Sequence, residues 1–193
     1  MTLTVSMAAR ETQLNDYAGQ FGSAAQIAFF SGTAPTNADT AFSGNVLLAN
    51  VPMASTPFAS ATAATPSVIV ANTISQENAI ATGTTTFYRA YSSGSSGAIS
   101  GSSFVVGNVY MIAALGSSTS ANWISIGLAS GATAAVGQMF ICSATSLTGS
   151  GTATLMGTIE QGAVATSGAD ININTTSIVG GGALTITSFQ RQF

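Results

Sequence analysis

The sequence contains very little charge. Its 193 residues include 3 Lys and Arg together and 6 Asp and Glu, so that charged residues make up only 5% of the chain. An ordinary soluble domain carries roughly a quarter of charged residues. The three cations, Arg10, Arg89 and Arg191, are far apart and form no basic cluster. Because nucleic-acid binding relies on many cations that face phosphates, we expect no nucleic-acid partner.

Histidine is absent altogether. Its absence excludes a Ser-His-Asp triad, a His-ligated zinc ion and an imidazole pH switch. No two acidic residues lie within three positions of each other in the sequence; they are Glu11, Asp16, Asp39, Glu77, Glu160 and Asp170. We therefore predict that the protein is not an enzyme and that it binds no cofactor and no metal.

Cysteine is nearly absent, and long apolar runs are missing. The single cysteine, Cys142, cannot form an internal disulfide, and its place in the apolar run 139–142 predicts a buried, inert thiol. The first residues lack the basic start and apolar segment of a secretory signal. No stretch of about 18 residues is apolar enough to span a bilayer. We expect synthesis in a reducing cytosol and no membrane partner.

The residues that are abundant favour short strands. Ala, Ser, Thr, Val and Ile alternate between Gly-containing turns, and this composition is typical of β proteins. Helical segments that could connect parallel strands are missing. We predict a mainly β fold: an antiparallel β-sandwich with one N-terminal α-helix and an inserted small β subdomain. Strands are expected at 25–31, 46–51, 67–71, 84–91, 104–115, 123–128, 137–144, 153–160, 170–174 and 183–189.

Residues 5–21 form the one clear amphipathic helix in the pattern. Leu14, Tyr17 and Phe21 fall near one face, and most polar side chains fall on the other. The preferred interpretation is a helix that covers the sheet with this apolar face. The alternative is a docking helix for a neighbouring subunit, which makes these three side chains candidates for a subunit interface.

Two Gly/Ser-rich segments, 92–98 and 147–152, enclose a separate set of expected strands. They predict an inserted β module at 94–153 and a sandwich domain made of 1–93 plus 154–193. We expect the module to project on these segments as on hinges. If so, replacing it with a short linker leaves a folded sandwich.

Aromatic side chains supply the other candidate site. Tyr88 and Tyr91 lie in the expected strand 84–91, and Trp123 lies in the module. Such residues often line a subunit interface, and a glycan-binding surface is the alternative. Asp170 also begins an oxygen-rich row with Asn172 and Asn174, but strand geometry places all three on a solvent face rather than in a calcium loop.

Several segments resemble a known group of proteins. The runs FSGTAPTNADT (30–40), TFYRAY (86–91) and GAVATSGADININTTSIVGGGALTITSF (162–189) resemble a family of small structural proteins of tailed bacteriophages. In that family the second and third segments lie close together in the chain, whereas about 60 residues separate them here. That spacing is in keeping with an insertion.

The expected module has a likeness of its own. The runs GNVYMI (107–112), WISIG (123–127), VGQMFICSAT (136–145) and GSGTA (149–153) are similar to a module found in phage tail-fibre, collar and head-associated proteins. Asn122 stands where that module usually carries an acidic residue. Neither likeness implies catalytic residues.

Together these observations predict a non-enzymatic structural component of a bacteriophage particle. The preferred role is a capsid decoration or cement protein, located in the virion after assembly in the host cytoplasm. A tail, neck or collar component is the alternative within the particle, and a receptor- or glycan-binding module is the alternative of another class. The expected partners are the major capsid protein or the neck and tail proteins. A low-charge chain also favours a homo-oligomer, with a trimer as the preferred state for a cement protein.

Overall fold

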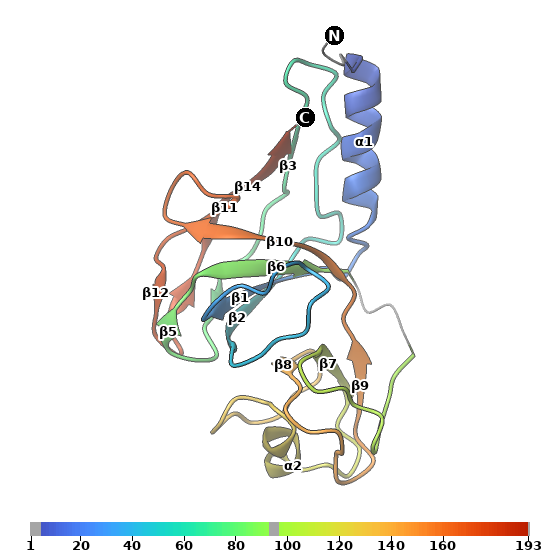
Figure 1. Cartoon of the computed structure of the whole chain (residues 1–193), viewed down its shortest axis with the longest axis vertical. Helices are drawn as coiled ribbons and strands as arrows, with labels where there is room; N and C mark the ends of the chain where they lie inside the picture. Colours follow the sequence, from blue (N-terminus) through green and yellow to red (C-terminus); the bar gives the residue numbers. More distant parts are fainter. Residues whose placement is uncertain (1–4, 93–96, 193) are drawn as a thin grey trace.

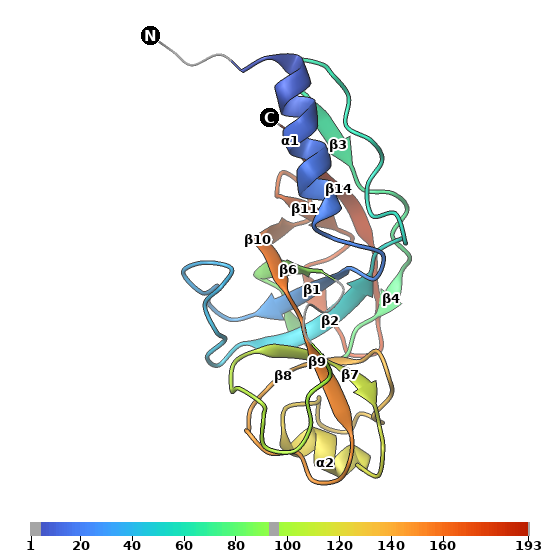
Figure 2. The same ribbon diagram turned by 90° about the vertical axis from the view of Figure 1, so that its right-hand side faces the viewer.

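The computed structural model describes residues 5–92 and 97–192. The protein is mainly β and elongated, with α1 (Met7–Gly19) at one end, α2 (Ser120–Ser125) at the other and a large sheet between them (Figures 1 and 2). This confirms the predicted fold class. None of the helices described is long and apolar enough to cross a membrane.

A seven-stranded sheet forms the centre of the fold, in the order β2-β1-β6-β10-β11-β14-β3. Its strands are β1 (Gln26–Ser31), β2 (Val46–Pro52), β3 (Val68–Val70), β6 (Phe87–Tyr91), β10 (Thr158–Ala165), β11 (Ile171–Ile173) and β14 (Ile186–Gln192). All neighbours are antiparallel except β10 and β11, which pair in parallel over two residues. The predicted antiparallel pairing therefore holds except for this one contact. The strand predicted at 153–160 is wrong in its bounds, because it joins β9 (Thr152–Leu155), which belongs to another sheet, to the start of β10.

Central strands of this sheet are buried on both faces. In β1, Ile27 and Phe29 belong to a core on one face, and Ala28 and Phe30 belong to a core on the other. The sequences of such strands are continuous apolar runs, because neither face of the strand is exposed to solvent. In β6 the same alternation places Tyr88 on the first face and Arg89 with Tyr91 on the second.

The first face is covered by α1 and by two small sheets. These sheets pair β4 (Glu77–Asn78) with β13 (Ala183–Leu184) and β5 (Gly83–Thr84) with β12 (Ser177–Ile178). Their buried Leu184 and Ile178 join the same core as Ile27 and Phe29. This second layer is what makes the arrangement sandwich-like.

Helix α1 packs with its apolar face on the core, as its preferred interpretation predicted. The Ser6 side chain accepts a hydrogen bond from the backbone N–H of Ala9 at 3.2 Å and caps the first turn. Leu14 is fully buried. The helix ends at Gly19, so the buried Phe21 lies beyond it and stacks edge-on against Phe58, with ring centroids 4.9 Å apart.

The inserted module forms a lobe with its own core. It contains the sheet β8-β7-β9, made of β7 (Val109–Ala114), β8 (Met139–Ile141) and β9 (Thr152–Leu155), together with α2. The strand predicted at 123–128 is wrong, because α2 occupies 120–125. Thr119 and Asn122 cap this helix reciprocally, and one and a half turns are too short to show a helical period.

The second predicted hinge is also wrong. A side chain on Gly151 would collide with the Trp123 ring at 2.6 Å, and the Ser150 hydroxyl accepts a hydrogen bond from the Ser117 N–H at 3.0 Å. Residues 147–152 are therefore a packed turn of the module. The module extends to the end of β9, past the predicted boundary at 153, and joins the sheet through Met156 and Gly157. Of the first hinge, 92–98, residues 93–96 lie outside the described residues.

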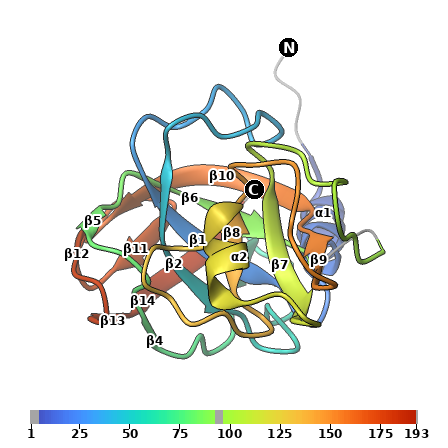
Figure 3. The same ribbon diagram turned by 90° about the horizontal axis from the view of Figure 1, so that it is seen from below.

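A third core joins the module to the sheet, so it does not project freely. Val109 and Met139 of the module pack against Phe30, Phe42 and Phe87 of the sandwich. Figure 3 shows the module lying across this face of the sheet. We call residues 5–92 with 157–192 the sandwich lobe and residues 97–156 the module.

Candidate functional site at the junction of the two lobes

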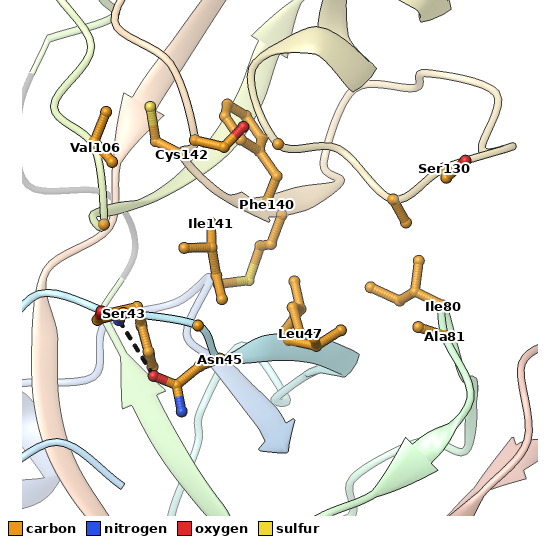
Figure 4. A pocket seen from close by; sticks show the side chains of 18 of the residues that line it. Ser43, Asn45, Leu47, Ile80, Ala81, Val106, Ser130, Phe140, Ile141 and Cys142 are labelled. Carbon is orange, nitrogen blue, oxygen red and sulfur yellow. Dashed lines mark hydrogen bonds between the residues drawn. The ribbon is translucent and has the colours of Figure 1, made fainter. Parts of the chain in front are cut away.

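A groove of about 810 Å³ runs between the sandwich lobe and the module. Figure 4 shows Leu47, Ile80 and Ala81 on the sandwich side of the groove and Phe140 and Ile141 on the module side. Val46 and Val106 at its rim are about half exposed, at 48% and 52%. None of the described residues that line it carries a charged side chain. The groove is therefore a neutral, largely apolar concave surface, which the sequence pattern did not reveal because its walls come from several separate segments of the chain.

Edge strands of two sheets lie at this groove. β2 is the edge of the seven-stranded sheet, and β8 is the edge of the three-stranded sheet. The Leu48 carbonyl of β2 already accepts hydrogen bonds from the N–H groups of Ile80 and Ala81, at 2.7 and 3.2 Å. That part of the edge is consequently closed, and the side chains rather than the backbone dominate the groove.

Cys142 lies in the wall of the groove but is buried, at 1% exposure. Its thiol donates to the Ala144 carbonyl at 3.0 Å, and burial raises the pKa of the thiol. A raised pKa lowers the fraction of reactive thiolate. The predicted burial is confirmed, and the geometry gives this thiol no activating base among the residues that line the groove.

A second, smaller cavity of about 150 Å³ opens on the other side of Gly107. Its lining includes Arg89 of β6, Asn108 before β7 and Thr158 at the start of β10, together with the exposed Asp39 and Thr40. Unlike the groove, this cavity is predominantly polar. Its central group is the Arg89 guanidinium, whose carbon lies 4.1 Å from the centre of the Phe42 ring.

The opposite face of β6 carries a partly buried ionic cluster. Tyr88 donates to Glu160 at 2.6 Å, and Arg191 donates to the same carboxylate through Nη2 at 2.7 Å and through Nε at 3.1 Å. Arg191 Nη2 also contacts the Tyr88 hydroxyl. Burial, reinforced by the neighbouring Glu160 charge, raises the pKa of Tyr88. Because these residues come from β6, β10 and β14, the cluster ties the C-terminal strand to the centre of the sheet.

The six residues predicted as a subunit interface are mostly interior. Leu14, Phe21, Tyr88, Tyr91 and Trp123 are between 0 and 1% exposed, and only Tyr17 is half-buried. Their expected contact with another subunit is therefore wrong for five of the six, because each side chain is already packed within its own lobe. Burial of Tyr88, Tyr91 and Trp123 also removes the basis for a glycan-binding surface.

The oxygen-rich row that begins at Asp170 is used within the fold. Asp170 accepts a hydrogen bond from the Ala163 N–H at 2.8 Å, and Asn172 donates to the Ser188 hydroxyl at 2.7 Å. Among the residues described, no group of three or more His, Cys, Asp or Glu side chains could hold a metal ion. The arrangement supports loop structure rather than a calcium site.

Comparison of the chain with protein-family models, with curated proteins and with solved structures found no match. The function must therefore be argued from the chemistry of the two lobes.

Proposed function

We propose that the protein is a non-enzymatic structural component of a bacteriophage particle, and that it serves as a capsid decoration or cement protein. The observation that carries this proposal is the character of the exposed surface, which is nearly uncharged and contains a neutral apolar groove. The resemblance of the segments 30–40, 86–91 and 162–189 to phage structural proteins is the reason for proposing that the particle is a bacteriophage.

The cations of the chain are used for internal structure. Arg89 is 3% exposed, and the Arg191 side chain is 19% exposed and paired with Glu160. Of the three Arg residues, only Arg10 remains outside these clusters. A surface with so few cations is poorly suited to phosphate-rich partners, which supports a protein partner over nucleic acid.

Large apolar side chains remain at the surface, where they favour association with another protein. Seven are about half exposed or more: Met7, Val46, Val70, Val105, Val106, Val136 and Val179. Val46 and Val106 face the groove, and Val136 belongs to the same module. A low-charge subunit with such a surface is suited to permanent assembly, and we expect a homo-oligomer, most simply a trimer, in contact with the major capsid protein.

Quantitative mass spectrometry of purified particles, with antibody labelling in electron micrographs, tests this role. A decoration protein should occur in a copy number comparable with that of the major capsid protein and should label the whole head. Labelling confined to the neck or tail, at far lower copy number, would show that the protein is a neck or tail component rather than a decoration protein. Absence from purified particles would overturn the virion proposal altogether.

A further inference from the structure

The polar cavity beside Arg89 contains a buried cation that forms no ion pair with any carboxylate of the described residues. The Arg89 Nε donates to the Gln161 side chain at 2.9 Å, and Nη2 donates to the carbonyls of Asn37 and Thr40 at 3.1 and 2.7 Å. All three acceptors are neutral. Within residues 5–92 and 97–192, no carboxylate oxygen lies within 4.0 Å of this guanidinium, because the ion pairs there involve Arg191 alone.

Arg191, whose side chain is partly buried, provides an internal comparison. Arg191 pairs with Glu160 at 2.7 Å and lies 3.8 Å from Asp170. Burial acts to lower the pKa of Arg191, but Glu160, together with Tyr88 and Tyr17, more than offsets burial and the pKa is raised. At Arg89 burial dominates and the pKa is lowered. A buried charge is costly unless it is paired, so Arg89 lacks the compensation that Arg191 has.

Further polar residues line the cavity beside Arg89. Asn108 and Thr158 are among them. The cavity of about 150 Å³ is well above the roughly 10–15 Å³ that one water needs, so it can admit a group as small as a carboxylate.

We propose that this cavity is an oxyanion site that takes a carboxylate, with Arg89 as its central donor. Charge-assisted hydrogen bonds from a guanidinium to a carboxylate are short and strong, and they would compensate the buried cation. The carboxylate can come from an acidic side chain of a neighbouring subunit or from a free small acid, because both present the same group. This site does not depend on the proposed role in a virion.

Asp39 gives the site a built-in competitor. It is exposed and lines the cavity, and its charge acts to raise the pKa of Arg89 although the two side chains form no ion pair within 4.0 Å. An incoming anion is repelled by this carboxylate. Replacing it with the neutral Asn should therefore strengthen anion binding, whereas replacing the distant Glu77 should not.

Titration of the full chain with sodium acetate, against sodium chloride at equal ionic strength, tests the proposal by melting temperature and calorimetry. Wild-type protein should show saturable stabilisation by acetate. Asp39→Asn should bind acetate roughly two- to fivefold more tightly, the size of a partly screened single-charge interaction. Glu77→Gln, which removes one charge elsewhere, should bind as wild type does. An acetate response no larger than that of chloride would overturn the proposal.

Asn108→Asp provides a second test that leaves Arg89 itself unchanged. This change places a carboxylate in the wall of the same cavity, so it should raise the melting temperature and abolish the acetate response. A lower melting temperature with an unchanged response would contradict the site. Inorganic phosphate serves as the second probe: saturation by phosphate without saturation by acetate would overturn the assignment to a carboxylate. If acetate binds to the isolated protein but not to the protein in purified particles, an acidic side chain of a neighbouring subunit occupies the site in the particle. If acetate binds in both, the natural ligand is a free small acid.

Discussion

The backbone N–H of Phe42 donates to the carbonyl of Gly107 at 2.9 Å, and this bond joins the sandwich lobe to the module. Gly107 has a φ of +85°, and a Cβ there would lie 2.8 Å from the Phe42 carbonyl oxygen. Both cavities at the lobe junction include Gly107 in their lining. The close approach of two backbones at this point therefore shapes the groove on one side and the Arg89 cavity on the other.

Substitution of this glycine should loosen the junction. Gly107→Ala combines a left-handed φ with a steric conflict and should lower the free energy of unfolding by about 1–3 kcal/mol. Gly137→Ala is the matched control, because Gly137 has a φ of +90° and open space around its Cβ position. Chemical denaturation of both variants separates the two contributions. Equal losses of stability would show that the contact with Phe42 adds nothing.

The shared core predicts that both lobes unfold together. Met139 of the module is 1% exposed and packs against sandwich residues, so Met139→Ala should cost about 2–5 kcal/mol. Trp123 is the only tryptophan and lies in the module core, so its fluorescence reports on the module, while far-ultraviolet circular dichroism reports on the whole chain. We expect the two transitions to coincide in wild type and in Met139→Ala. Two separate transitions would restore the picture of independent lobes.

Local pattern predicted much of this fold because much of it depends on near neighbours in the chain. The alternation in 84–91 correctly placed Tyr88 opposite Arg89 and Tyr91, and the apolar spacing of 5–21 placed Leu14 towards the core. Composition likewise predicted a mainly β protein. These features follow from side-chain periodicity alone.

The predictions that failed depend on contacts between distant residues. Gly149 and Gly151 have the composition of a flexible segment, but they are required because Ser118 and Trp123 pack directly against them. Trp123 was predicted in a strand because its neighbours are apolar. It lies in α2 instead, because Thr119, four positions earlier, caps the start of that helix. The groove and the Arg89 cavity combine residues from several elements, so no single stretch of sequence contains their signal.

Truncation within α1 tests its role in the core. Leu14 is fully buried among core residues, so Leu14→Ala should lower the free energy of unfolding by about 2–5 kcal/mol in the isolated protein. Met7→Ala, at a side chain that is 51% exposed on the same helix, should leave thermal stability nearly unchanged. If Leu14→Ala leaves the melt untouched but reduces attachment to particles, α1 is a docking element after all.

Groove variants test the contact expected in the particle. Val46→Glu places a charge at the rim of a groove that has none, at a side chain 48% exposed. Its effect on the melting temperature should be small, because surface substitutions usually stay within about 0.5 kcal/mol. Association with particles should nevertheless weaken. Val179→Glu, which introduces the same charge at a side chain 63% exposed and outside the groove lining, serves as the control. Equal binding of both variants would exclude the groove as the contact.

Two buried tyrosines on opposite faces of β6 should respond differently to loss of the hydroxyl. The Tyr88 hydroxyl donates a charge-assisted hydrogen bond to Glu160. Tyr88→Phe removes this bond and should lower the free energy of unfolding by about 1.5–3 kcal/mol. The Tyr91 hydroxyl has no partner among the described residues, so Tyr91→Phe should be neutral or slightly stabilising at pH 7. Thermal melts of the two variants measure the difference.

Alkaline pH should affect these two variants in the same direction. Burial raises the pKa values of Tyr17, Tyr88 and Tyr91 in the folded protein, whereas an unfolded tyrosine ionises near pH 10. The folded state then retains protons that the unfolded state loses, so stability is complete below about pH 10 and declines as the pH rises further. Either Phe variant removes one such proton and should make the decline shallower. The measurement is the fall in melting temperature from neutral to alkaline pH. An equal fall in wild type and in both variants would show that these hydroxyls ionise in the folded protein without unfolding it.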